Sequence, residues 1–214
     1  LEFTFSDKRW LTREEMLADN DRIVEDALGF HIPGYFDKVL DIRECHFQPD
    51  PSNAIRDSVR RYAHRKSLAF FNIRQQSGFL RNLIIRTTRS GNVMVIVVFF
   101  MYERERINGL MEHLRTEFPR ITSLYYIINT KKNDSLSDQV PVLYSGDDHL
   151  LEEIDSLKFR IGPLSFYQTN TLQAGKLYAI AKEFAGLTGR ETVYDLYTGA
   201  GTIACYVAGE AGKV

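Results

Sequence analysis

The sequence contains little cysteine, no long hydrophobic run and no recognisable export signal. Its only two cysteines, Cys45 and Cys205, stand far apart in a chain of 214 residues. Such a pair offers no disulfide framework, so we expect a reducing, cytoplasmic setting. No apolar run approaches the ~20 residues that a membrane-spanning helix requires. We therefore expect no membrane among the partners of this protein.

The composition is typical of a soluble globular protein, with 44% hydrophobic and 26% charged residues. The length allows one large domain or one and a half ordinary domains. The first residues, Leu1–Phe5, have neither an initiator methionine nor a basic region, so they are not a signal peptide. They alternate as in a strand, and we expect further residues upstream of them.

Positive charge is concentrated in one segment, although the formal net charge is only −1. Residues 51–90 contain nine Lys or Arg side chains and one acidic side chain, Asp57. Four of these basic residues fall on one expected helix: Arg56, Arg60, Arg61 and Arg65. A basic face rich in arginine predicts contacts with RNA phosphates. The alternative is an ordinary solvated helix face followed by strand edges.

Residues 1–158 have the pattern of an α+β domain with a largely antiparallel sheet. Alternating or apolar runs predict strands at 1–6, 79–87, 93–102, 124–128 and 140–144, and a hairpin at 27–42. Apolar spacing predicts helices at 11–26, 52–66 and 104–117. Thr12 and Glu15 have the spacing of a capping box in the first helix. We expect this central domain to contact RNA.

The pattern changes near residue 158, where we place a domain boundary. Asn170 can cap a helix that extends to Leu187, Gly189 is expected to end it, and residues 192–196 should form a buried strand. This order is the beginning of a doubly wound, Rossmann-like α/β domain. We expect residues 159–214 to be only the first part of that domain.

The most informative motif follows the expected strand: Asp195-Leu196-Tyr197-Thr198-Gly199-Ala200-Gly201-Thr202. A strand, a Gly-x-Gly turn and a helix of small residues bring a ligand against bare backbone amides. Gly199–Ala204 also fits the weak fingerprint of dinucleotide sites. On this pattern alone, S-adenosylmethionine (SAM) and NAD remain equally open.

This motif and an earlier segment, Ser165-Phe166-Tyr167-Gln168-Thr169-Asn170, resemble the RNA uracil-5-methyltransferases. These enzymes use SAM to make 5-methyluridine in ribosomal or transfer RNA. The family pattern is an aromatic-Gln-x-Asn segment, a helix, and then Asp-Leu-aromatic-Cys-Gly-x-Gly. Leu1–Ser6, Gly29–His31 and Asp41–Cys45 show a looser similarity to the family's central domain. One departure is Thr198, which occupies the usual position of the cysteine.

The resemblance implies that SAM lies over the glycine turn and that the Gln168 motif favours SAM over NAD. By matched position, the cofactor-binding residues are Gln168, Tyr197, Gly199, Gly201 and Thr202. The glycines permit a tight turn and close approach of the ligand. Gln168 could instead be an ordinary loop residue and Tyr197 a core residue. We expect Asp195 to order the loop and not to touch substrate.

Cys45 matches a metal ligand in one branch of the family. There, a cysteine at this place is the fourth ligand of a four-iron four-sulfur cluster, whose other ligands lie upstream. One cysteine cannot hold a cluster, so a free, buried side chain is the alternative. We expect Cys205 to serve packing alone.

The family's catalytic residues are a Cys nucleophile, which attacks carbon 6 of uracil, and a Glu base, which removes the proton from carbon 5. The resemblance places both beyond Val214, so we expect no catalytic residue in this chain and no activity from it alone. The intact protein is expected to be a monomeric enzyme acting on ribosomal RNA or tRNA. Two other functions stay open: an RNA-binding module without catalysis, and a SAM methyltransferase with a non-RNA substrate.

Overall fold

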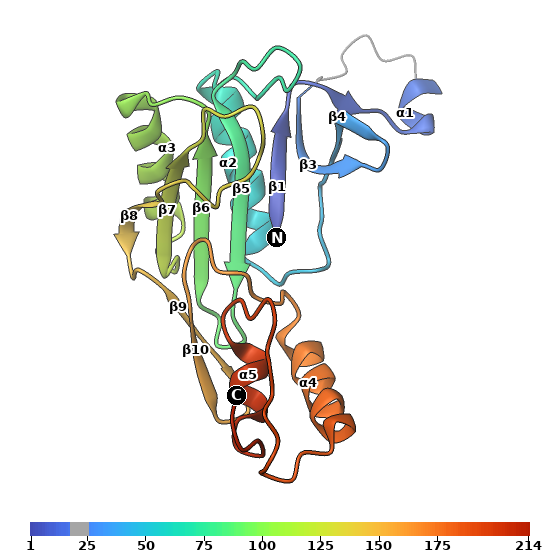
Figure 1. Ribbon diagram of the computed structural model, residues 1–214. Helices are drawn as coiled ribbons and strands as arrows, with labels where there is room; N and C mark the ends of the chain where they lie inside the picture. Colours follow the sequence, from blue (N-terminus) through green and yellow to red (C-terminus); the bar gives the residue numbers. More distant parts are fainter. Residues whose placement is uncertain (18–25) are drawn as a thin grey trace. The chain divides into compact units, whose positions relative to one another are not determined.

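The computed structural model describes residues 1–17 and 26–214, which fall into two compact units (Figure 1). The first unit comprises Leu1–Thr87 and Val93–Asp147, and the second comprises Thr88–Asn92 and Asp148–Val214. The division at Asp147 lies ahead of the boundary that we expected near residue 158. The difference arises because a hairpin absent from the sequence-based expectation belongs to the second unit.

The first unit is built on an eight-stranded sheet with the order β2-β4-β3-β1-β5-β6-β7-β8. Its strands are β1 (Glu2–Ser6), β2 (Arg9–Trp10), β3 (Ala27–Ile32), β4 (Tyr35–Asp41), β5 (Leu80–Thr87), β6 (Val93–Phe99), β7 (Ser123–Ile128) and β8 (Val142–Gly146). Neighbouring strands run antiparallel except in the β2–β4 and β6–β7 pairs. The largely antiparallel sheet expected for this part of the chain is confirmed.

Two helices complete the core of this unit, α2 (Ser52–Arg65) and α3 (Arg104–Glu117). They contact each other, and their buried side chains share one apolar cluster with the sheet. The residues that face this cluster from α3 have the i, i+3, i+4 and i+7 spacing on which the helix at 104–117 was predicted: Ile107, Leu110, Met111 and Leu114. Helix α3 also supplies the crossover that the parallel β6–β7 pair needs. Burying an aliphatic side chain of this size contributes ~1.5–3 kcal/mol.

Helix α1 (Arg13–Leu17) begins at the expected capping box. The Glu15 amide donates to Thr12 Oγ1 at 3.2 Å, and the Thr12 amide donates to Glu15 Oε2 at 2.9 Å. The remainder of the helix expected over residues 11–26 falls largely on residues 18–25, which lie outside the described residues.

The second unit contains a hairpin of β9 (Leu150–Ile154) and β10 (Leu157–Ile161), followed by α4 (Thr171–Ala185) and α5 (Thr202–Val207). Asn170 caps α4 as expected, since its Oδ1 accepts from the Gln173 amide at 3.1 Å. The helix ends at Gly186, which has a left-handed φ of 54°, and not at Gly189.

The buried strand expected at residues 192–196 is not formed. Thr192 makes an isolated parallel bridge to Lys213, while Tyr194 and Leu196 are exposed. A strand of a doubly wound sheet needs neighbours along its edges and cover on both faces. Among the described residues of this unit, only Lys213 forms a β-bridge with residues 192–196.

Candidate functional site

The two motif segments identified in the sequence lie side by side in the second unit. A Cβ atom placed on Gly199 would lie 3.8 Å from Phe166 Cδ1 and 3.9 Å from the Phe166 carbonyl oxygen. The segment that carries Gln168 therefore adjoins the glycine turn, although more than thirty residues separate them in sequence. This proximity is what a single ligand site formed by both motifs requires.

The glycine turn is a succession of left-handed backbone conformations. The φ angles are 64° at Tyr197, 57° at Gly199 and 75° at Gly201. Such values suit glycine, and at Tyr197 they cost energy that the surrounding hydrogen bonds must offset. Helix α5 begins directly after Gly201, so its first amides face the turn.

Asp195 holds the turn in this shape. Its Oδ2 accepts a hydrogen bond from Thr198 Oγ1 at 2.7 Å and another from the Ala204 amide at 3.2 Å. One carboxylate thus links the loop to the first turn of α5 and lies where the helix dipole favours negative charge. These contacts agree with the expectation that Asp195 orders the loop.

The predicted cofactor residues are accessible to a ligand. Tyr197 is fully exposed, which argues against the alternative of core packing, and Gln168 is also exposed. Thr202 is half-buried, and its Oγ1 lies 3.2 Å from the Tyr178 hydroxyl of α4. A Cβ atom on Gly199 or Gly201 would meet nothing closer than 3.8 Å, so the backbone there is open to close approach. These residues therefore leave the turn accessible to a cofactor, and their assignment to SAM stays a prediction.

Glu152 is a buried carboxylate in the second unit that the sequence pattern did not identify. It is 3% exposed. It accepts hydrogen bonds from the Arg89 amide at 3.2 Å, the Glu153 amide at 3.1 Å and Thr171 Oγ1 at 3.1 Å. Burial and then this carboxylate raise the pKa of Tyr167 to about 12. Glu152 therefore joins the turn at 88–92 to the start of α4.

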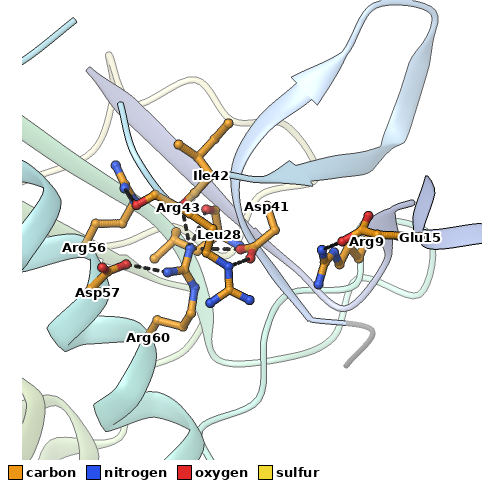
Figure 2. Close-up of polar contacts among 9 residues, drawn as sticks. All are labelled: Arg9, Glu15, Leu28, Asp41, Ile42, Arg43, Arg56, Asp57 and Arg60. Atoms are coloured by element: carbon orange, nitrogen blue, oxygen red, sulfur yellow. Dashed lines mark hydrogen bonds and ion pairs between the residues drawn. The ribbon is translucent and has the colours of Figure 1, made fainter. Parts of the chain in front are cut away.

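The expectation that four arginines form one exposed face of α2 is wrong for Arg56 and Arg60, which are buried. Arg60 Nη2 donates to Asp41 Oδ1 at 2.9 Å and to the carbonyl oxygens of Leu28 and Ile42 at 3.2 and 2.8 Å (Figure 2). Arg56 Nη2 donates to the Arg43 carbonyl at 2.7 Å (Figure 2). Both side chains therefore satisfy polar groups where α2 meets the chain around β3 and β4.

The other two arginines of α2, Arg61 and Arg65, are exposed. Arg61 lies 3.8 Å from Glu117 Oε1, and the Arg65 guanidinium lies 5.4 Å from the Tyr62 ring centroid. An ion pair of this length and an exposed cation–π contact are both weak, so Arg61 and Arg65 can exchange their present contacts for phosphate. They remain candidates for RNA contact.

A polar cluster of Ser58, His113 and Glu117 lies between α2 and α3. Ser58 Oγ is 2.8 Å from His113 Nε2 and donates to Glu117 Oε2 at 2.8 Å. Glu117 Oε2 is also 3.0 Å from the same ring nitrogen. A hydrolytic triad would place the acid on the other ring nitrogen, Nδ1, so this cluster joins two helices and is not a nucleophilic centre.

Cys45 is buried in the apolar core of the first unit, and its amide donates to Asn53 Oδ1 at 2.9 Å. Residues 1–17 and 26–214 contain no group of three His, Cys, Asp or Glu side chains placed to hold a metal ion. Cys45 therefore has the environment of a packed thiol here, and a four-iron four-sulfur cluster, whose other ligands the resemblance places upstream of this chain, stays a prediction for the intact protein. None of the helices described is long and apolar enough to cross a membrane.

The fold is similar to that of a solved structure. The structure resembles the Pyrococcus abyssi tRNA (uracil-54, C5)-methyltransferase in complex with S-adenosyl-L-homocysteine, with a TM-score of 0.69 and 24% identity. The match covers 98% of this chain and 45% of that chain. At this identity the likeness concerns the fold alone.

Sequence relatives define the family more closely, although no model of a known protein family matches the chain. Uncharacterised RNA methyltransferases of Bacteroides thetaiotaomicron and Porphyromonas gingivalis are each 53% identical over 100% of this chain. A third, from Chlorobaculum tepidum, is 36% identical over 97% of it. The chain belongs to the RNA methyltransferase family that its motifs indicated. It spans about half the length of these relatives, 48%, 47% and 44% respectively.

Proposed function

We propose that this chain is part of an enzyme that transfers a methyl group from SAM to carbon 5 of a uridine in ribosomal RNA or tRNA. The observation that carries the proposal is the meeting of the Phe166–Gln168 segment with the turn at Gly199, because both belong to the family's cofactor motif. Relatives with 53% identity are RNA methyltransferases, and the neighbour in fold is bound to S-adenosyl-L-homocysteine. Residues 159–214 are then the beginning of a Rossmann-like SAM domain.

In this proposal the residues of the glycine turn and Gln168 make different contributions to cofactor binding. Gly199 and Gly201 let the ligand approach the backbone, and Asp195 keeps the turn closed. Gln168 offers a polar amide and Tyr197 an exposed ring against the adenosine. SAM, when bound, supplies the electrophilic methyl group.

RNA is held by cations of the first unit. Arg61 and Arg65 are the residues of the basic segment on α2 that remain available for phosphates. The nucleophile and the base that the family uses are expected in the part of the protein that follows this chain. The intact protein is proposed to be a monomer.

The test is product analysis with the intact protein. RNA transcripts are incubated with SAM that carries an isotopically labelled methyl group, and the digested nucleosides are identified by mass spectrometry. The proposal predicts label in 5-methyluridine. Label in a different base, or in protein or small molecules only, would overturn the uridine assignment, and RNA binding without any label would favour a binding module.

A further inference from the structure

The β3–β4 hairpin in the first unit presents large aromatic side chains to solvent. Tyr35 is 50% exposed and Phe36 is 62% exposed. The guanidinium carbon of Arg74 lies 5.0 Å from the centroid of the Phe36 ring. An arginine next to an exposed ring forms a cation–π pair, and both members still have surface open to a further flat group.

Arg74 is held in place by a buried acid. Its Nε donates to Asp37 Oδ2 at 2.5 Å, and the Asp37 side chain is 12% exposed whereas that of Arg74 is 64% exposed. The Arg74 hydrogen bond and charge hold the pKa of Asp37 below its usual range. Because this bond uses one of the five guanidinium N–H donors, the terminal amino groups can serve a ligand.

The turn that carries Arg74 is rigidly built. The amides of Asn72 and Ser77 donate to each other's carbonyl oxygens at 2.7 and 3.3 Å. Asn72 Oδ1 accepts from the Gln75 amide at 2.8 Å, and Asn72 Nδ2 donates to Asp7 Oδ2 at 2.7 Å. A turn fixed in this way presents its arginine at a small entropic cost upon binding.

We infer that Phe36 and Arg74 form a stacking site for one unpaired base of the RNA substrate. Unpaired bases are recognised by stacking on aromatic rings and arginine planes, and a nearby cation favours the adjoining phosphate. This inference rests on the proposed RNA substrate and adds a contact away from the arginines of α2. The pair leaves most of both side chains in solvent, so packing alone does not account for it.

The experiment measures binding of a single-stranded oligouridylate, and of an RNA duplex of equal length, to the intact protein at low salt. Phe36→Leu should weaken single-strand binding about tenfold, the scale of one lost stack, and change duplex binding far less. Phe36→Tyr should retain affinity. Arg74→Lys, which keeps the charge but loses the plane, should weaken single-strand binding several-fold. Phe47→Leu is the matched control, because Phe47 is 83% exposed.

Three results would overturn the inference. Equal affinities for Phe36→Leu and Phe47→Leu, with a wild-type protein that binds RNA, would remove the stacking site and leave the proposed function intact. A change in oligomeric state or melting temperature with Phe36→Leu, without loss of RNA affinity, would assign the hairpin to packing. Failure of the wild-type protein to bind either RNA would reject the RNA substrate together with this inference.

Discussion

At the scale of single residues, the neighbouring arginines Arg60 and Arg61 of α2 differ in burial and in their hydrogen-bond partners. Arg60 is 8% exposed and satisfies two carbonyl groups and the Asp41 carboxylate, whereas Arg61 is exposed. Burial, and not residue type, therefore separates the structural arginines of this helix from those proposed to contact RNA. Charge counting along the sequence treats the two residues as equivalent.

Arg60→Ala should destabilise the protein by about 3 kcal/mol, because it removes the buried hydrogen bonds that Arg60 donates to Asp41 and to the Leu28 and Ile42 carbonyls. Asp41 would keep only its contacts with Arg43 and the Leu28 amide. Arg61→Ala should change stability by no more than ~0.5 kcal/mol and reduce the salt dependence of RNA binding by about one unit of slope. Urea denaturation and RNA titrations at several salt concentrations measure both effects. Equal stability losses for the two variants would contradict the assignment.

Gly199 tests the cofactor turn at the same scale. Gly199→Val places a branched side chain at a φ of 57° where the ligand is expected to meet the backbone, so SAM binding by the intact protein should collapse. Gly186→Val is the matched control. Gly186 has a similar φ of 54° and open space around it, but it lies at the end of α4 and not in the glycine turn. Calorimetric titration with SAM measures the difference, and an equal loss in both variants would indicate general strain.

At the scale of elements, the Ser58–His113–Glu117 cluster fastens α2 to α3. Burial lowers the pKa of His113 below its ordinary value of 6.5, Arg65 and Arg61 lower it further, and Glu117 opposes them. A pKa lowered by folding means that the unfolded chain binds the proton more readily. The contribution of His113 is therefore present above pH 6.5 and lost as the pH falls through the lower pKa of the folded state.

His113→Gln should flatten the dependence of stability on pH as the pH falls below 6.5, relative to the wild type. The exposed His46 provides the control substitution, His46→Gln. Urea midpoints determined at several pH values give the slopes. A wild-type slope that survives in His113→Gln would show that other groups cause it.

The segment from Val193 to Leu196 should be among the least protected parts of this 214-residue chain. The Val193 amide donates to the Lys213 carbonyl at 2.8 Å, but Tyr194 and Leu196 are exposed. Residues Val95–Val98 are buried in β6, between two paired strands. Local opening should therefore make amide exchange at 194–196 much faster than at 95–98. Equal protection in a verified monomer would contradict this expectation.

At the scale of the whole molecule, the sequence predicted those elements that carry a regular apolar pattern or a local cap. The spacing of Ile107, Leu110, Met111 and Leu114 and the caps at Thr12 and Asn170 were sufficient for the helices. The β9–β10 hairpin was missed because Glu152 and Glu153 interrupt its apolar pattern, and Glu152 is buried only through partners distant in sequence. The strand at 192–196 was expected from its composition but lacks the neighbours that would pair it.

The candidate site was predictable in part for the same reason. The glycine turn is a local motif, and the left-handed φ angles of Gly199 and Gly201 suit their residue type, whereas that of Tyr197 could not be predicted from the sequence. Its contact with Phe166 required the fold, and the burial of Arg56 and Arg60 depended on unpaired carbonyl groups that a sequence does not display. The assignment of individual residues to SAM and RNA remains a prediction.

The central claim is most directly tested by following the hydrogen on carbon 5 of uridine. Transcripts labelled with tritium at this carbon are incubated with the intact protein, and the tritium released to water is counted with and without SAM. The account predicts SAM-dependent release in a one-to-one ratio with methyl transfer, and none from the Gly199→Val variant. Methyl transfer to RNA without tritium release would show that the enzyme modifies a different atom and would contradict the account.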